Sequence, residues 1–369
     1  MTEGTVSTRN NPFTPSFGSI PPLMAGRNYL IQDILEGLDN GPGDPHRATI
    51  FVGARGSGKT ALLAKIAEDA AQHGWINAKV TAIEGMLEDI IQRSQESASE
   101  FLEKNRSGKI TGVGIAGLSI TRTIESTPEG NWRTRMNKLL DTLDENGIGL
   151  LITVDEVNVA LDEMRTLAAV FQHFISERRN VALLMAGLPH NVSAMLQDKT
   201  ISFLRRAFQH HLGSIELHDV KETIKNTVEL SGRSIEEQAL DMATLATGGF
   251  PFLIQLIGYH IWRQHSQNEV ISMEDAEDGV EYARSDMKRM IFDTTLREIS
   301  DTDEKFLLAM SLDEGDSQLV DIAARLGVTS NYANQYRNRL IEQGIIGSAG
   351  RGKLKFEIPM LKEYLREKP

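Results

Sequence analysis

Eight residues, from Gly53 to Thr60, follow the spacing G-x-x-x-x-G-K-T, which places a lysine and a hydroxyl directly after a glycine-rich turn. The preceding residues 48–52 are apolar and β-branched, and residues 61–71 repeat apolar side chains at helical spacing. Strand, loop and helix thus follow in the order in which backbone N–H groups and a helix N-terminus surround an anion. The sequence therefore predicts a phosphate-binding loop.

The residue types of this loop predict roles toward a nucleotide. Lys59 would contact the β- and γ-phosphates as a catalytic point charge, and the Thr60 hydroxyl would hold Mg²⁺. Adenine is favoured over guanine by elimination, because no NKxD motif follows the last expected strands. ATP is the expected ligand, and the expected binding residues are Gly53, Ala54, Arg55, Gly56, Ser57, Gly58, Lys59, Thr60 and Ala61.

A second chemical pattern is an apolar segment, residues 149–154, that ends in Asp155 and Glu156. Buried parallel strands of this kind end at a ligand cleft. Asp155 would bind the magnesium ion, mostly through water, and Glu156 would orient and deprotonate the water that attacks the γ-phosphate. Alone, two acids at a strand end could simply be solvated. With the upstream loop, they predict a hydrolytic site.

The elements that position these residues alternate between strand and helix, which predicts an α/β, P-loop (AAA+-like) parallel sheet core over residues 21–217. Strands are expected at 48–52, 78–83, 149–154, 181–186 and 214–217, with helices at 28–38, 85–104, 132–145 and 160–178. Residues 1–20 are Pro-rich and expected to be flexible. Glycines within 108–124 suggest a hairpin-like insertion.

Strand patterns stop after residue 217. Helical periodicity over 218–297 predicts an all-α lid that is interrupted at 247–251. Residues 298–369 predict a winged helix-turn-helix, with a first helix at 319–327, a recognition helix at 331–343 and a wing at 347–358.

Composition excludes several classes of protein. The chain has 369 residues, no cysteine and a formal net charge of −12, so disulfides and thiolate chemistry are excluded and any nucleic-acid contact must be local. Four histidines, at 190, 210, 211 and 218, lack the partners of a zinc site. Without an apolar leader or an 18-residue apolar run, we expect a cytoplasmic protein that does not span a membrane.

With these motifs in this order, residues 20–365 resemble the AAA+-type P-loop ATPases, in particular the branch that contains archaeal-type ATPases, STAND signalling ATPases and origin-recognition initiators. The resemblance implies that Arg27, at the end of Met24-Ala25-Gly26-Arg27, and Pro251, within Gly249-Phe250-Pro251, contact the base. It also implies that Arg206, or its neighbour Arg205, acts on the γ-phosphate across a subunit interface of a homo-oligomer.

This chain departs from the AAA+ pattern at two places. The strand that should end in a polar sensor residue ends in Ala186-Gly187-Leu188, so either Asn191 takes this role or the role is lost. The lid arginine of initiators is replaced by the GxP-like Gly249-Phe250-Pro251. Both departures favour a nucleotide-dependent switch over a processive motor.

The C-terminal segment carries a local basic strip that could contact duplex DNA. Residues in the recognition helix and wing that could do so are Ser330, Asn331, Asn334, Gln335, Arg337, Arg339, Arg351, Lys353 and Lys355. The favoured hypothesis is a Mg²⁺-dependent ATPase that acts as a nucleotide-driven switch on this DNA-binding segment. The alternative is a STAND-like interaction module with little hydrolysis, whose winged helix binds protein.

Overall fold

The computed structural model describes residues 10–16, 18–106, 130–158, 162–350 and 352–368. By the contacts between residues, the chain forms two units. The sheet unit comprises Tyr29–Val52 and Lys59–His211, and the helical unit comprises Met1–Asn28, Gly53–Gly58 and Leu212–Pro369. The insertion that we expected at 108–124 lies outside the described residues.

The sheet unit is built on five parallel strands in the order β2-β3-β4-β1-β5. The strands are β1 (Ala48–Val52), β2 (Trp75–Thr81), β3 (Gly149–Asp155), β4 (Val181–Gly187) and β5 (Phe208–His211). β3 and β4 are buried almost throughout, as expected for central strands that are covered on both faces. This parallel sheet confirms the predicted α/β core.

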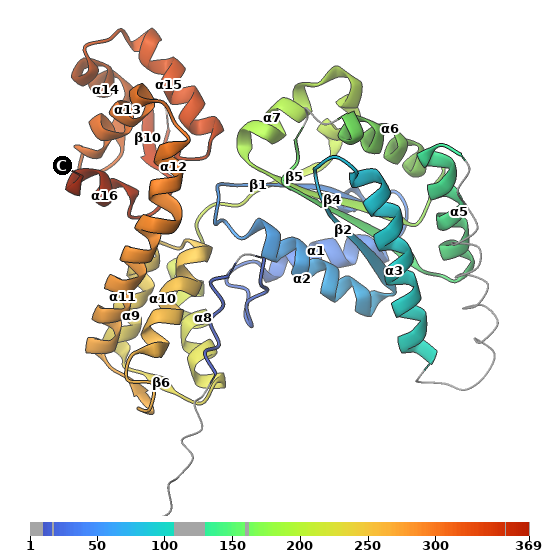
Figure 1. The fold of residues 1–369 in the computed structure, drawn as a ribbon, viewed down its shortest axis with the longest axis horizontal. Coiled ribbons are helices and arrows are strands. Elements are labelled where there is room, and N and C mark those ends of the chain that lie inside the picture. Colours follow the sequence, from blue (N-terminus) through green and yellow to red (C-terminus); the bar gives the residue numbers. More distant parts are fainter. Residues whose placement is uncertain (1–9, 17, 107–129, 159–161, 351, 369) are drawn as a thin grey trace, which may run out of the picture. The chain divides into compact units, whose positions relative to one another are not determined.

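Helices cover both faces of this sheet, with α1 and α2 below it and α6 and α7 above it in Figure 1. The longer helices are α1 (Asn28–Asp39), α2 (Lys59–Ala70), α3 (Met86–Arg106), α5 (Trp132–Glu145), α6 (Asp162–Ser176) and α7 (Pro189–Gln197). Short helices are η1 (Pro45–Arg47), η2 (Ala71–His73) and η3 (Lys199–Arg206). The apolar faces of α3, α5, α6, α7 and η3 form one buried cluster with strands β1–β4.

The last strand of the sheet differs from its prediction. The expected strand at 214–217 is wrong, since β5 is Phe208–His211 and Leu217 already begins a helix. β5 is an edge strand of sequence FQHH with mostly exposed side chains, so it has no apolar pattern to reveal it. The apolar Ile215 instead donates its backbone N–H to Gly249 O at 2.8 Å, within the helical unit.

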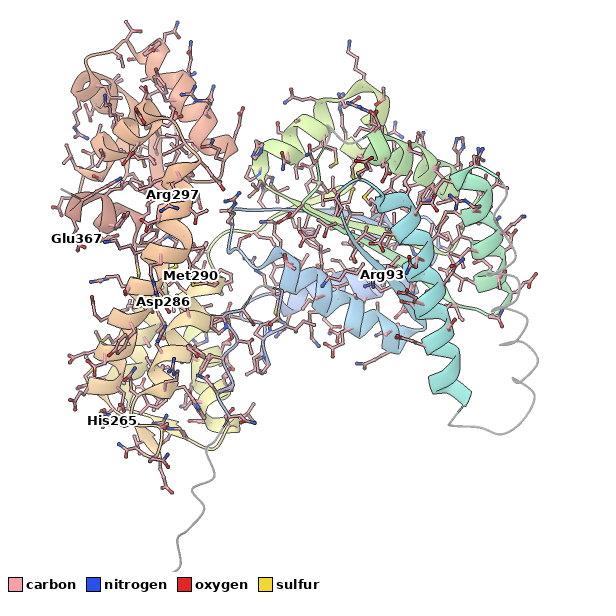
Figure 2. All side chains as sticks on the ribbon, in the orientation of Figure 1. Arg93, His265, Asp286, Met290, Arg297 and Glu367 are labelled. Atoms are coloured by element: carbon pink, nitrogen blue, oxygen red, sulfur yellow. The ribbon has the colours of Figure 1, made fainter. Side chains whose placement is uncertain are left out.

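Residues 217–297 of the helical unit are mostly α-helical, and this segment is called the lid below. It consists of α8 (Leu217–Leu230), α9 (Glu237–Thr247), α10 (Pro251–Arg263) and α11 (Met273–Met287), with a short pair of strands, β6 (Ser234–Ile235) and β7 (Val270–Ile271). A π-helical turn, Lys288–Phe292, and α12 (Asp293–Arg297) continue α11. The labelled Asp286, Met290 and Arg297 follow one another along this rod (Figure 2).

The C-terminal segment contains α13 (Asp301–Ser311), β8 (Ser317–Gln318), α14 (Leu319–Leu326), α15 (Ser330–Glu342), β9 (Ile346–Ser348), β10 (Lys353–Phe356) and α16 (Leu361–Glu367). The three strands form one sheet in the order β8-β10-β9. The prediction of a winged helix depends on this order of elements: a helix pair, α14 and α15, followed by the antiparallel strands β9 and β10.

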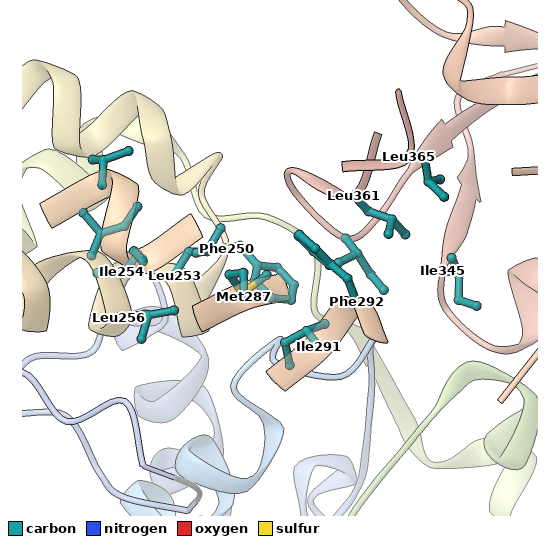
Figure 3. Close-up of a cluster of buried hydrophobic side chains, with 14 of the residues drawn as sticks. Phe250, Leu253, Ile254, Leu256, Met287, Ile291, Phe292, Ile345, Leu361 and Leu365 are labelled. Atoms are coloured by element: carbon teal, nitrogen blue, oxygen red, sulfur yellow. The ribbon is translucent and has the colours of Figure 1, made fainter. Parts of the chain in front are cut away.

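Lid and C-terminal segment share one hydrophobic core. The rings of Phe292 and Tyr364 stack with their centroids 5.1 Å apart, and the Tyr364 hydroxyl donates to Asp293 at 2.9 Å. Figure 3 shows Phe250 and Met287 of the lid close together, with Phe292 between them and Leu361 of α16. The apolar contacts are thus continuous across residue 298, and the two parts pack as one body.

The N-terminal residues 11–14 also belong to this core. Phe13 is buried against α10, although residues 1–20 were expected to be a flexible lead-in. The prolines of this segment prevent regular secondary structure, but they do not prevent an extended chain from docking through side chains.

One ion pair of the lid predicts a dependence of stability on pH. His265 Nδ1 lies 2.7 Å from Oδ1 of the fully buried Asp275, and the hydrogen bond and charge of Asp275, with Glu274 and Asp278 nearby, raise the pKa of His265. A raised folded-state pKa adds stability that is complete below the unfolded value, about 6.5, and is lost as the pH rises through the folded value.

As the pH rises above about 6.5, we therefore expect the free energy of unfolding to fall more steeply in the wild type than in His265→Gln. Urea unfolding at a series of pH values measures this difference. Parallel profiles for the two proteins would contradict the assignment.

Candidate nucleotide-binding site

In the sheet unit, α2 begins at Lys59 and β3 ends at Asp155, so these two elements carry the residues, Thr60 and Asp155, that we expect to hold magnesium. The Thr60 Oγ1 hydroxyl donates a hydrogen bond to Asp155 Oδ2 at 2.5 Å. A hydroxyl and a carboxylate are oxygen donors of the kind that Mg²⁺ prefers. The pair therefore fits the ion that we expected these two residues to hold.

Glu156 has an unusual backbone conformation. Its φ is +55°, in the left-handed region that disfavours residues with a Cβ. Its N–H donates to Asp155 Oδ1 at 2.9 Å, and the next residue, Val157, is buried and donates its N–H to Ala186 O at 2.9 Å. These contacts hold Glu156 exposed at the end of β3, and backbone strain of this kind occurs often at functional sites.

The end of β4 explains the missing polar sensor residue. A Cβ at Gly187 would lie 2.5 Å from Val157 Cγ2 and 3.1 Å from Val192 Cγ2. No side chain fits at this position, so apolar packing replaces the polar group that the AAA+ pattern has there. Asn191 is half-buried in the first turn of α7, and its sensor role stays a prediction.

In the helical unit, the glycines of the phosphate-binding loop lie against the start of α10. Gly56 and Gly58 have φ values of +78° and +84°. A Cβ at Gly56 would be 2.7 Å from the Phe250 ring, and one at Gly58 would be 3.4 Å from Pro251. The Phe252 N–H also donates to Gly56 O at 3.2 Å. Loop conformation and close approach to the lid both require glycine at 56.

Two side chains of the same loop differ in their surroundings. Ser57 is only 4% exposed, and its Oγ has no hydrogen-bond partner among the described residues. A buried orphan hydroxyl costs free energy unless a ligand satisfies it, so Ser57 fits a loop that binds phosphate oxygens. Arg55 Nη1 lies 2.9 Å from Glu298 Oε2, with both side chains about half exposed, so this pair contributes about 0–1 kcal/mol.

The two segments that the family resemblance assigned to the base are joined through Gly213–Ile215. Arg27 Nη2 donates to Gly213 O at 2.6 Å. Ile215 contacts both segments, because a Cβ at Gly26 would be 2.7 Å from its Cγ2 and its N–H donates to Gly249 O. Arg27 and the segment that ends at Pro251 thus both contact the backbone or side chains of residues 213–215. The sequence did not indicate this role for Gly213–Ile215.

Arg206 is exposed at the end of η3, directly before β5. Its neighbour Arg205 donates through Nε to Leu196 O at 2.6 Å, at the C-terminal end of α7. Of the two, Arg205 therefore has a structural contact within its own unit. The expected role of Arg206 requires a second copy of the chain and stays a prediction.

The basic strip of the C-terminal segment is partly neutralised by internal contacts. Arg339 Nη2 lies 2.8 Å from Oδ1 of Asp303, which is 3% exposed, and its guanidinium covers the Tyr336 ring. Lys355 pairs with Glu357 at 3.2 Å, and Arg337 donates to Asn334 at 3.0 Å. Side chains exposed on α15 and β10 include Asn331, Gln335 and Lys353, whereas Arg351 lies outside the described residues.

Two further findings concern only the part of the chain that the structure describes. No group of three or more His, Asp or Glu side chains there could hold a metal ion. None of its helices is long and apolar enough to cross a bilayer.

The backbone of Glu156 provides a test of the strain at the candidate site. Glu156→Asn should be more stable than Glu156→Gln by about 1 kcal/mol, because both remove the carboxylate but asparagine tolerates the left-handed region better. Thermal unfolding measures the difference. Glu68, in α2, is a matched control at which the order should reverse, because glutamine is the better helix former. If the asparagine variant were the more stable one at both positions, or the glutamine variant at both, backbone strain at Glu156 would be contradicted.

The chain was compared with families and known proteins. The family model "Domain of unknown function (DUF8462)" matches residues 289–365, which begin within the π-helical turn and include both Phe292 and Tyr364. A search of curated proteins finds no match. The ORC2 protein of Aeropyrum pernix (ADPNP-ADP complexes) has a TM-score of 0.50 at 14% identity, covering 95% of this chain and 97% of that chain.

Cdc6p from Pyrobaculum aerophilum is similar to the same extent, with a TM-score of 0.50 at 18% identity, covering 95% of this chain and 96% of that chain. At such identities the likeness concerns the fold. It agrees with the strand order of the sheet unit and with the helices that cover it. The chain therefore has the AAA+-type P-loop fold of the origin-recognition proteins.

Proposed function

We propose that this chain is a cytoplasmic ATP-binding protein, a Mg²⁺-dependent ATPase that acts as a nucleotide-driven switch on a DNA-binding C-terminal segment. The observation that carries the proposal is the 2.5 Å hydrogen bond between Thr60 and Asp155, the two residues that the sequence assigns to magnesium. The nucleotide complexes of the structurally similar ORC2 protein support the choice of ligand.

The polar residues of this site then have distinct roles in ATP hydrolysis. The backbone N–H groups of Gly53–Gly58 and the Lys59 ammonium bind the phosphates, and Thr60 and Asp155 hold the magnesium ion. The ion, when bound, neutralises charge that develops on the phosphate oxygens. Glu156 orients the attacking water and accepts its proton, so that ADP and phosphate are the products. Arg206 of a second copy would stabilise the same charge.

Turnover should be slow, which suits a switch better than a motor. The apolar contact between Val157 and Gly187 occupies the place of the polar sensor residue. On this proposal one source of transition-state stabilisation is missing, whereas the sequence contains every residue that we expect to bind the phosphates. Slow cleavage prolongs the lifetime of the ATP-bound state.

Contacts within the helical unit suggest how the nucleotide state reaches the C-terminal segment. The loop Gly53–Gly58 contacts Phe250–Phe252, and Arg55 contacts Glu298. Because the lid and the C-terminal segment share one core, a shift of α10 would carry α15 and β10 with it.

DNA is the favoured partner because α15 exposes amides at Asn331 and Gln335, and β10 exposes Lys353. Such side chains can contact base edges and phosphates. The second candidate is a STAND-like module that binds protein and hydrolyses little ATP. It is favoured by the internal pairing of Arg339 and Lys355, which leaves this surface less positive than the sequence suggests.

The nucleotide site is tested by two substitutions. Lys59→Ala should lower ATP affinity by roughly 10–100-fold, because a charge-assisted contact is lost. Glu156→Gln should keep the affinity and lower turnover by about 100-fold or more. Titration with a fluorescent ATP analogue and steady-state phosphate release measure the two effects. Equal affinity of the wild type and Lys59→Ala would refute the proposed site.

Phosphate release measured with and without duplex DNA separates the two candidate functions. A DNA-controlled switch predicts turnover that changes when DNA is added. The interaction module predicts turnover no faster than that of Glu156→Gln under either condition.

Two basic residues of the C-terminal segment should behave differently. Lys353→Ala should weaken duplex binding equally for all sequences and lower the slope of log affinity against log salt by about 1. Arg339→Ala should instead destabilise the fold by roughly 1–3 kcal/mol, since the buried Asp303 loses its charged partner. Fluorescence anisotropy and thermal unfolding distinguish them.

The matched control is Lys305→Ala, an exposed lysine on α13. If it weakened DNA binding as much as Lys353→Ala does, the surface of α15 and β10 would not be the DNA contact.

A further inference from the structure

The N-terminal residues 11–14 are bound to α10 like a short peptide ligand (dark blue in Figure 1). Asn11 Nδ2 donates to Tyr259 O at 2.9 Å, and the Thr14 N–H donates to Gln255 Oε1 at 3.0 Å. The Phe13 N–H donates to Asn11 Oδ1 at 3.0 Å, which turns the chain so that Phe13 enters the core. Phe13 is only 2% exposed.

The Phe13 ring can pack against α10 at residue 258 because this residue is glycine and has no side chain. A Cβ at Gly258 would lie 2.2 Å from Cδ1 and 2.3 Å from Cε1 of the Phe13 ring. Gly258 lies in the middle of α10, where glycine destabilises a helix relative to alanine. The helix therefore has a residue of low helix propensity at a position that the Phe13 ring covers.

Residues 11–14 are connected in two ways to elements of the candidate nucleotide site. α10 begins at Pro251, seven residues or about 10 Å before Gly258, where Phe250–Phe252 contact Gly56 and Gly58. In the other direction the chain runs on to Arg27, which is bonded to Gly213 O. The segment is therefore connected, through α10 and through the chain that follows it, to both segments that the family resemblance assigns to the base.

We propose that residues 11–14 form an intramolecular strap and that Phe13 is a positioning residue for nucleotide binding. Phe13 contacts no nucleotide itself. It holds α10 in the position in which Phe250–Phe252 contact the phosphate-binding loop. Nucleotide binding then costs less conformational entropy, because α10 is already positioned. This inference rests on the proposed nucleotide-binding function and adds a residue to it.

The docking is tested by a double-mutant cycle on the full chain. In the wild type, Gly258→Ala should lower the melting temperature by a few degrees, because the new methyl group displaces the Phe13 ring. In Phe13→Ala the place is vacant, so the same substitution should raise the melting temperature through better helix propensity. An effect of the same sign in both backgrounds would overturn the docking.

The positioning role is tested by the affinity for a fluorescent ATP analogue. Phe13→Ala should raise the Kd about fivefold, and Phe13→Leu should restore most of the affinity because it refills the place. The matched control is Phe306→Ala, an equally buried phenylalanine of α13, which should lower the melting temperature without changing the Kd.

The possible outcomes separate the inference from the proposed function. An unchanged Kd in Phe13→Ala, or an equal rise in Phe306→Ala, would overturn the positioning role and leave nucleotide binding intact. A wild-type chain that binds no nucleotide would overturn the proposed function and the positioning role together.

Discussion

The position of Asp155 at the end of a buried parallel strand is the constraint on which the candidate chemistry depends. β4 lies between β1 and β3. Gly187, which ends β4, is therefore close to the ends of both neighbouring strands. Gly187 pairs with Val52, the residue before the phosphate-binding loop, and Val157, directly after Glu156, packs on Gly187. The absence of a side chain at 187 thus lets the chain after β3 pack closely onto β4.

That close packing is linked to the strain at Glu156. Asp155 bonds Thr60 and Val157 bonds Ala186 O, and Glu156, which lies between them, takes the left-handed conformation. A glycine or asparagine would adopt it at lower cost. Glutamate at this position is therefore understandable through its proposed chemistry and not through its contribution to stability.

In the helical unit, glycines allow other side chains and backbone segments to pack closely against the chain. Gly56 accommodates Phe250, Gly249 accommodates the backbone of Ile215, and Gly258 accommodates Phe13. These contacts connect the phosphate-binding loop, the lid and the N-terminal segment to the core that the lid shares with the C-terminal helices. A nucleotide that changes the loop would therefore act on a single packed body.

The sequence by itself determined the local features: the glycine-rich loop between a strand and a helix, the paired acids after a buried strand, the alternation of strands and helices, and the later helical segments. These follow from residue type and spacing within a few neighbouring positions. Only the tertiary structure decided that β5 is the polar edge strand Phe208–His211, that Phe13 docks on Gly258, and that Asp303 neutralises Arg339. Such contacts join residues far apart in the chain, and side-chain packing and charge pairing across that distance leave no periodic pattern in the sequence.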